Sequence, residues 1–152
     1  MQVRKPYIED MPAWTAMRKI LWPHTTPSDN QEEAHRIFSG YPIEDEEETG
    51  AFMLEGPGGE LVGFIEVSMY ATLPYYPEKP VGFVEGWYVA EAFRRKGGGR
   101  KLMEAAAEWA SRRRCRVLGS DTEVWRKESV AAHTGTGFAI VHREGETIFF
   151  RR

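Results

Sequence analysis

Residues 94–100 read Arg-Arg-Lys-Gly-Gly-Gly-Arg and have the composition of an anion-binding loop. Glycines let the backbone approach a ligand closely with its N–H groups exposed, and the start of a helix adds a dipole that favours negative charge. A Walker A loop needs Gly-Lys-Ser/Thr after a longer spacer, and a dinucleotide fingerprint needs G-x-G-x-x-G. Neither pattern is present. The residues therefore predict a phosphate-binding loop of another kind, with a plain Gly-rich turn and a solvated basic edge as the alternative.

The elements around this loop are a strand before it and a long helix after it. Residues 81–89 have the apolar content of a strand, and residues 97–114 place Leu102, Ala106, Trp109 and Ala110 on one face of a helix. Elsewhere, periodicity predicts helices over 8–22, 31–38 and 128–134 and strands over 51–55, 61–70, 117–120, 138–141 and 147–150. The acidic run 44–48 is expected to be an exposed loop. The complete predicted order is βααβββαβαββ, in a single domain spanning residues 1–152.

Composition narrows the class of protein. The chain has 152 residues, 41% of them apolar and 12% aromatic, which suits one folded domain rather than a disordered chain. Apolar runs do not exceed four residues, so no membrane span is expected. The N-terminus lacks the apolar segment of a secretory signal, and a cytoplasmic location is expected. The single cysteine, Cys115, excludes an intramolecular disulfide and a Cys-rich zinc site, and we expect neither a metal nor a catalytic thiol.

The net charge of −3 conceals two opposed segments. Residues 28–60 contain ten acidic residues and one basic residue, a net charge of −9, whereas residues 94–127 contain eleven basic and four acidic residues, a net charge of +7. Either these are two solvated faces, or the protein binds an anionic ligand at one place and a cationic ligand at another. The arginines at 112–116 end a predicted helix and have no interleaved aromatics, so no nucleic-acid partner is expected.

The pattern Arg94-x-x-Gly97-x-Gly99, placed after a strand ending in Tyr88-Val89, resembles the acyl-CoA-binding signature of the GNAT superfamily of N-acyltransferases. The order of elements is similar as well, so the resemblance covers nearly the whole chain. It implies an α/β (α+β) GNAT fold, with a mixed, mostly antiparallel sheet of six to seven strands and about four helices. It also implies acetyl-CoA as co-substrate. The residues expected to contact it are Trp87, Tyr88, Val89, Arg94, Arg95, Lys96, Gly97, Gly98, Gly99, Arg100 and Arg126.

Four further segments resemble bacterial aminoglycoside 6'-N-acetyltransferases of this superfamily: residues 21–22, 83–86, 120–122 and 148–151. The resemblance implies acetyl transfer to the 6'-amine of aminoglycoside antibiotics, which confers resistance. It casts Glu85 and Asp121 as the acids that bind the polycationic substrate and accept its proton, and Trp22 and Tyr75 as substrate contacts. For each carboxylate the alternative is a surface ion pair or a cap, and for Trp22 it is a core position. Glu144 or Glu146 could supply a further acid.

The resemblance also implies a direct transfer. The co-substrate would lie between strands 81–89 and 117–120, Glu85 or Asp121 would deprotonate the amine directly or through water, and the Val89 N–H would stabilise the oxyanion. Two positions depart from the family. His133 stands where a Tyr often protonates the leaving thiolate, and a packed or solvent-facing His is the alternative. Arg126 stands where an Asn often contacts CoA, and it could reach a phosphate.

Other functions stay open from the sequence. A GNAT enzyme acting on a polyamine or a protein N-terminus would share the loop and the acidic segment, and a non-catalytic acetyl-CoA-binding module would share the loop alone. A domain that only associates with partners is a third possibility. The family often forms homodimers through its C-terminal strands, so a homodimer is expected.

Overall fold

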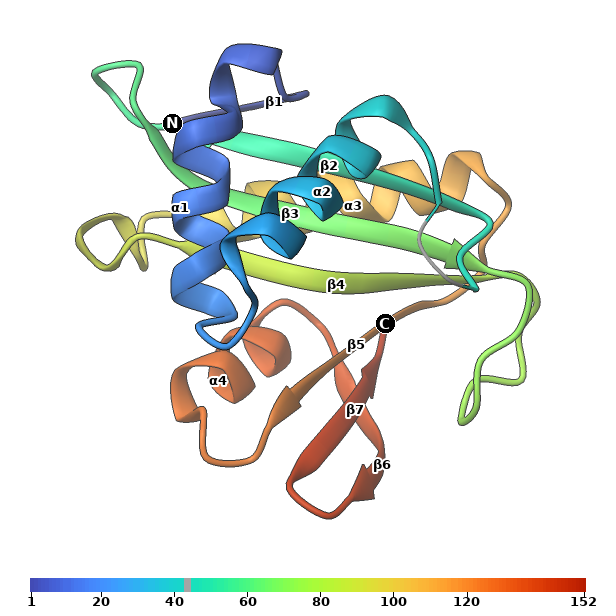
Figure 1. The fold of residues 1–152 in the computed structure, drawn as a ribbon. Coiled ribbons are helices and arrows are strands. Elements are labelled where there is room, and N and C mark those ends of the chain that lie inside the picture. Colours follow the sequence, from blue (N-terminus) through green and yellow to red (C-terminus); the bar gives the residue numbers. More distant parts are fainter. Residues whose placement is uncertain (43–44) are drawn as a thin grey trace.

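The computed structural model describes residues 1–42 and 45–152 and shows a central twisted sheet with helices on both faces (Figure 1). The order of elements confirms the predicted βααβββαβαββ, with two additional 3₁₀ turns at Ile8–Asp10 and Glu91–Phe93. The elements are β1 (Gln2–Arg4), α1 (Met11–Leu21), α2 (Pro27–Ser39), β2 (Glu48–Glu55), β3 (Leu61–Tyr70), β4 (Val81–Val89), α3 (Gly98–Arg112), β5 (Leu118–Glu123), α4 (Lys127–Gly135), β6 (Ala139–Glu144) and β7 (Thr147–Arg151).

The sheet has seven strands in the order β1-β2-β3-β4-β5-β7-β6, and every neighbouring pair is antiparallel except β4 and β5. This confirms the mixed, mostly antiparallel sheet. The parallel pairing is short, because it runs only from Gly82 opposite Leu118 to Val84 opposite Ser120. Beyond Val84 both strands continue without pairing to each other, so the sheet opens between them.

A β-bulge in β4 coincides with this opening. On β3, Glu66 pairs with Gly86 and the next residue, Val67, pairs with Val84, so Glu85 is an extra residue that has no partner position on β3. A bulge bends its strand and redirects the side chain at that point, and bulges are common beside active sites. The bend carries the second half of β4 away from β5 and turns Glu85 toward the gap.

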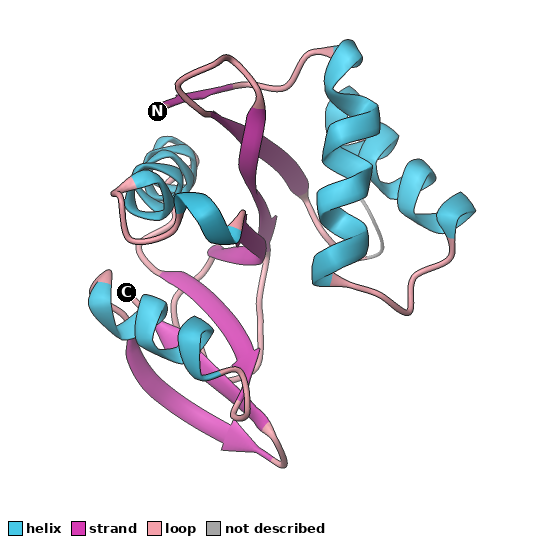
Figure 2. Ribbon diagram, turned by 90° about the vertical axis from the view of Figure 1, so that its left-hand side faces the viewer, coloured by secondary structure: helices cyan, strands magenta, loops and turns pink. Residues whose placement is uncertain are grey.

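Helices cover the two faces of the sheet in pairs, with α1 and α2 on one side and α3 and α4 on the other (Figure 2). Residues of β3 alternate between two apolar cores: Phe64 packs with Trp14 and Met17 of α1, whereas Ile65 and Val67 belong to the core under α3. Because both faces are covered, β3 is buried over most of its length. No helix in the described residues is long and apolar enough to cross a membrane.

The structure corrects the expected start of α2. The helix begins at Pro27, four residues before the predicted start, because Thr26 caps it by accepting a hydrogen bond from the Asp29 N–H (3.1 Å) and proline suits the first helical position.

The acidic run is only partly the exposed loop that was expected. Glu48 already lies in β2, and the half-buried Glu46 accepts a hydrogen bond from the Ser68 hydroxyl (2.8 Å). Glu44 lies outside the described residues.

Candidate active site

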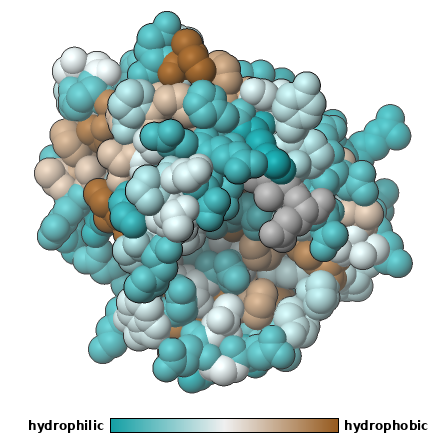
Figure 3. All heavy atoms as spheres, viewed as in Figure 1, coloured by the Kyte–Doolittle hydropathy of each residue, from teal (hydrophilic) through white to brown (hydrophobic). Residues whose placement is uncertain are grey.

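The divergence of β4 and β5 creates a pocket of about 130 Å³ next to the last residue of α1 and the start of α4. The surface viewed from the same side as Figure 1 is largely hydrophilic and is hollowed below the α1–α2 pair (Figure 3). Six residues expected from the sequence to bind substrate, to act in catalysis or to bind co-substrate come together in this pocket. The pocket is lined by Leu21, Trp22, Val84, Glu85, Gly86, Trp87, Ser120, Asp121, Thr122, Glu123, Arg126, Ser129, His133 and Thr147.

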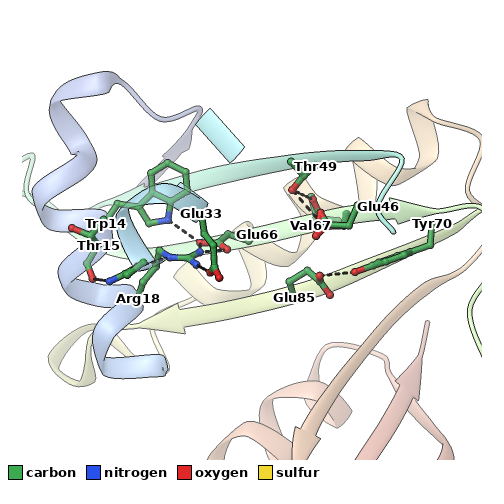
Figure 4. Close-up of polar contacts among 12 residues, drawn as sticks. Trp14, Thr15, Arg18, Glu33, Glu46, Thr49, Glu66, Val67, Tyr70 and Glu85 are labelled. Atoms are coloured by element: carbon green, nitrogen blue, oxygen red, sulfur yellow. Dashed lines mark hydrogen bonds and ion pairs between the residues drawn. The ribbon is translucent and has the colours of Figure 1, made fainter. Parts of the chain in front are cut away.

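Glu85 is a carboxyl group suited to proton transfer near neutral pH. Its Oε2 accepts a hydrogen bond from the Tyr70 hydroxyl (2.7 Å), as Figure 4 shows. Burial is the main reason that the pKa of Glu85 is raised to about 7, with the negative charges of Glu46, Asp121 and Glu66 adding to the effect and the Tyr70 hydrogen bond opposing it. A carboxylate with such a pKa is a competent general base at physiological pH.

Asp121 supplies a second carboxyl group from the other side of the opening. It lies on β5 opposite Phe149 of β7, directly after Ser120, the last β5 residue that pairs with β4. The pocket limits its hydration, and this desolvation, together with the charge of Glu123, raises the pKa of Asp121 to about 6. The negative charge of Asp121 adds to the rise in the pKa of Glu85.

Trp22 forms a wall of the pocket directly after α1. Its indole lies so close to Gly86 that a Cβ on that glycine would come within 2.5 Å of the ring. On another side the guanidinium of Arg18 lies 4.7 Å from the ring centroid. The Gly86 backbone and the Arg18 guanidinium therefore fix the Trp22 indole, which was expected to contact the substrate.

Arg18 belongs to a buried polar network that the sequence interpretation missed. Its Nε donates to Asn30 Oδ1 (2.7 Å), and its terminal nitrogens pair with Glu66 and Glu33, while Trp14 Nε1 donates to Glu66 Oε2 (2.9 Å) (Figure 4). Arg18 and Glu66 are each only 2% exposed. The available signal was spacing: Arg18 follows Trp14 by four residues, so both lie on the apolar face of α1.

His133 lines the pocket as a packed side chain rather than a solvent-facing one. Its ring stacks on Phe150 with centroids 4.5 Å apart, and its burial lowers the imidazole pKa. Nδ1 lies 2.7 Å from the Ser129 carbonyl, which only accepts, so Nδ1 carries the proton of the neutral ring and Nε2 accepts from the Ser120 hydroxyl (2.8 Å). Proton donation by His133 stays a prediction, and here it would require the imidazolium form that burial disfavours.

The predicted Tyr75 contact is not brought into the pocket lining. The Tyr75 ring stacks on His142 of β6 with centroids 3.8 Å apart, and its hydroxyl donates to Glu144 Oε2 (3.2 Å). Tyr75 and Glu144 therefore form a separate polar contact over the C-terminal hairpin. A role for either in substrate binding remains a prediction.

The Gly-rich loop has the backbone geometry of an anion site. Gly97 precedes α3 with φ +89°, a conformation that glycine adopts without strain, and Arg95 also has positive φ (+61°). The first amides of α3, at residues 98–100, have no carbonyl four residues earlier within the helix and can donate to a ligand. Trp87 Nε1 donates to the Gly99 carbonyl (3.1 Å) and ties the loop to β4.

The basic residues of the loop differ in their surroundings. Arg94 donates to the Val89 carbonyl (2.7 Å) and to Glu128 of α4 (2.9 Å), and Arg100 donates to the Gly135 carbonyl (2.8 Å). Arg95 and Lys96 are exposed beside the loop. Two of the expected co-substrate contacts, Arg94 and Arg100, therefore also connect the loop to α4.

The second half of β4 directs backbone groups into the gap between the strands. The Ala90 N–H donates to the Val62 carbonyl on the β3 side (2.7 Å). Because N–H and C=O groups of successive strand residues point to opposite sides, those of Trp87 and Val89 face the side from which β5 has diverged. The Val89 carbonyl already accepts from Arg94, whereas the Trp87 groups and the Val89 N–H are available to pair with an extended ligand.

Arg126 lines the pocket, and its predicted contact with CoA stays a prediction. Its Nε lies 3.0 Å from Glu123 Oε2, its Nη2 donates to the Leu21 carbonyl at 3.4 Å, and its guanidinium carbon lies 5.0 Å from the Trp125 ring centroid. The side chain thus bridges the β5–α4 connection to the end of α1.

A parallel strand pair that opens beside a glycine-rich helix start, with a carboxyl of raised pKa on each strand at the opening, is the architecture of an acyl-CoA N-acyltransferase. Residues 14–138 match the model of the acetyltransferase (GNAT) family, so the chain belongs to that family. It is 34% identical over 145 residues, 95% of this chain and 93% of the relative, to an aminoglycoside N(6')-acetyltransferase type 1 from Serratia marcescens. A relative of the same name from Klebsiella aerogenes is 36% identical over 91% of this chain and 90% of its own length.

Solved structures agree with this assignment. The aminoglycoside acetyltransferase AAC(6')-Iy, solved with the bisubstrate analogue CoA-S-monomethyl-acetylneamine, superposes with a TM-score of 0.83 at 25% identity, covering 95% of this chain and 94% of that chain. The Arabidopsis thaliana protein NAA60 in complex with a bisubstrate analogue shares the fold, with a TM-score of 0.78 at 15% identity and coverage of 99% and 96%.

Proposed function

We propose that this protein acetylates the 6'-amine of aminoglycosides, with acetyl-CoA as the acetyl donor, and thereby confers resistance to them. The observation that carries the proposal is the pair Glu85 and Asp121, with pKa values raised to about 7 and about 6 in the gap between β4 and β5. They offer both an anionic environment for a polycation and a base for its reacting amine. Full-length relatives named for this activity support the choice of substrate.

The residues present fit an acyl-CoA. Backbone amides of residues 98–100, with Arg95 and Lys96 beside them, would hold the pyrophosphate at the start of α3. Outward-facing backbone groups of Trp87 would pair with the pantetheine arm, which leaves the Val89 N–H for the thioester. When bound there, acetyl-CoA supplies an activated thioester.

Glu85 is the base that we assign to the reaction. The 6'-ammonium must lose a proton before its nitrogen can attack, and Glu85 accepts it directly or through one water molecule, while Asp121 holds the substrate through its charge. Trp22 presents a flat apolar wall to a sugar ring. The Val89 N–H donates to the oxygen that becomes negatively charged. No covalent enzyme intermediate is needed, so Cys115 has no part in the reaction.

Matched antibiotics test the proposal. Neomycin and paromomycin differ in carrying an amine or a hydroxyl at the 6' position, so thiol release from acetyl-CoA is expected with neomycin, and paromomycin is expected to give none. Equal turnover of both would exclude 6' selectivity. Turnover of spermidine or of a peptide N-terminus without any aminoglycoside would assign the enzyme to another amine, and turnover of none of them would indicate a non-catalytic acetyl-CoA-binding module.

Two further proposals concern the state of the protein in the cell. β6 is an edge strand whose Ile140 is 56% exposed, and pairing with a second copy would cover it, so we propose a homodimer, to be tested by light scattering. We place the protein in the cytoplasm, where acetyl-CoA is available, and cell fractionation tests this location.

A further inference from the structure

The guanidinium of Arg126 is a cation inside a pocket that we propose for a polycation. The pocket wall also carries three carboxylates, Glu85, Asp121 and Glu123, and Arg126 faces the last of them. A fixed positive charge at this place would repel an incoming ammonium group. The arrangement therefore needs a reason other than substrate attraction.

The contacts of Arg126 within the pocket are poor for a guanidinium. Its Nε is 3.0 Å from Glu123 Oε2 but is not aligned for a hydrogen bond, and among the described residues it is the buried side-chain polar atom that lacks a hydrogen-bond partner. The bond from Nη2 to the Leu21 carbonyl, at 3.4 Å, is longer than most N–H···O bonds. Arg126 and Glu123 are 29% and 43% exposed, a setting in which an ion pair contributes little.

The volume of the pocket is small for the proposed substrate. Its volume of about 130 Å³ is below the roughly 300–1,000 Å³ typical of ligand sites, and an aminoglycoside has at least two amino-substituted rings. The Arg126 side chain lines the pocket between the end of α1 and the β5–α4 connection, so its displacement would enlarge the space for a substrate.

Resting on the function proposed above, we infer that Arg126 is a displaceable internal counterion, and that Glu123 is the binding site for a second ammonium group of the substrate. An entering ammonium takes over Glu123 with three N–H donors, and the displaced guanidinium opens the pocket toward solvent. The pocket thus keeps its charge balance before and after binding. Acceptors with a second ammonium near the reacting amine are favoured over monoamines.

Two measurements test this inference: the Kd of paromomycin from calorimetry and the steady-state kinetics with neomycin. Arg126→Met keeps the aliphatic stem and removes the competing charge, so the paromomycin Kd is expected to fall about two- to fivefold, the range that an exposed ion pair contributes. Glu123→Gln is expected to raise Kd about fivefold or more. In the double variant, the effect of Arg126→Met should be lost, because its target carboxylate is gone. Arg36→Met, which removes an exposed pair with Glu32 on α2, is the matched control and should leave Kd unchanged.

The outcomes separate this inference from the proposed function. If wild-type protein acetylates neomycin and Arg126→Met instead raises the KM for acetyl-CoA, Arg126 is a CoA contact and the inference is wrong while the function stands. An equal decrease of Kd in the Glu123→Gln background would show general repulsion and would also overturn it. Absence of both neomycin turnover and paromomycin binding in the wild type would overturn the inference and the proposed function together.

Discussion

Replacing Tyr70 with Phe tests whether Glu85 is the base. The substitution removes the hydroxyl that donates to Glu85 Oε2 at 2.7 Å and keeps the ring that packs edge-on against Phe83. This hydrogen bond stabilises the ionised carboxylate and opposes the effect of burial on its pKa. Its removal must therefore raise the pKa of Glu85 above about 7.

The size of the shift follows from the energy of the bond. A hydrogen bond to a charged group contributes about 1.5–3 kcal/mol, and one pKa unit corresponds to about 1.4 kcal/mol, so the pKa should rise by about one to two units. At pH 7 the ionised fraction of Glu85 then falls from about one half to between about a tenth and a hundredth. We expect kcat/KM at pH 7 to fall roughly five- to fiftyfold and to recover as the pH rises toward 9.

The assay is the pH profile of kcat/KM for neomycin, measured by thiol release. Deprotonation of the substrate amine contributes its own limb, but this limb is common to both proteins, so the difference between the profiles reports the enzyme group. Tyr75→Phe is a matched control, because it removes a 3.2 Å bond to Glu144 outside the pocket lining. An acidic limb that stays in place, near pH 6, would assign the base to Asp121 and refute the role given to Glu85.

Three more predictions follow from burial and backbone geometry. Burial raises the pKa of Glu85 from 4.5 to about 7, so the stability that this group contributes is present below pH 4.5 and is lost as the pH rises through 7. Glu85→Gln should inactivate the enzyme, yet its free energy of unfolding in urea should gain on the order of 3 kcal/mol relative to wild type between pH 4.5 and 8. A difference that does not change with pH would contradict this prediction. Arg18→Met leaves Glu66 charged and buried, so it should lower the free energy of unfolding by about 3–5 kcal/mol and Tm by roughly 6–20 °C. Adding Glu66→Leu to this variant should restore Tm, and an unchanged Tm in the single variant would disprove the pairing. Gly97→Ala and the control Gly59→Ala place alanine at φ +89° and +84°, where a side chain is strained, so each should lower the free energy of unfolding by about 1–2 kcal/mol. Only Gly97→Ala should weaken acetyl-CoA binding in calorimetry, and equal affinity of the two variants for acetyl-CoA would exclude the loop as the phosphate site.

Local patterns were sufficient for the elements around the proposed co-substrate site. The apolar content of residues 61–70 and 81–89, bounded by Gly- and Pro-containing turns, gave the bounds of β3 and β4 as the structure has them. The glycines at 97–99 also indicated the start of α3, because the conformational effect of a glycine depends on its neighbours in the chain. These features are local and can be recognised in one sequence.

Features that depend on register could not be recognised in this way. The bulge at Glu85 exists only relative to β3, whose paired residues lie about twenty positions earlier in the chain. β5 was expected to end at residue 120 but extends to Glu123, because pairing with β7 holds residues that are polar and lack strand periodicity. The alternation of β3 does place Glu66, Ser68 and Tyr70 on one face, which was the available signal for the Tyr70–Glu85 contact.

The separation of β4 from β5 supplies two requirements of acetyl transfer: free backbone groups for the co-substrate and a base for the reacting amine. It frees the outward backbone groups of Trp87 and Val89 from ladder pairing, and it leaves Glu85 partly buried in the gap, where its ionised form is poorly hydrated. A surface carboxylate with an ordinary pKa would be ionised at neutral pH but would be a weak base, whereas burial makes Glu85 more basic at a cost in stability. The neighbouring buried pair Arg18–Glu66 is close to neutral by itself, so it can fix Trp22 at the pocket without cancelling the negative charge that a polycationic substrate requires.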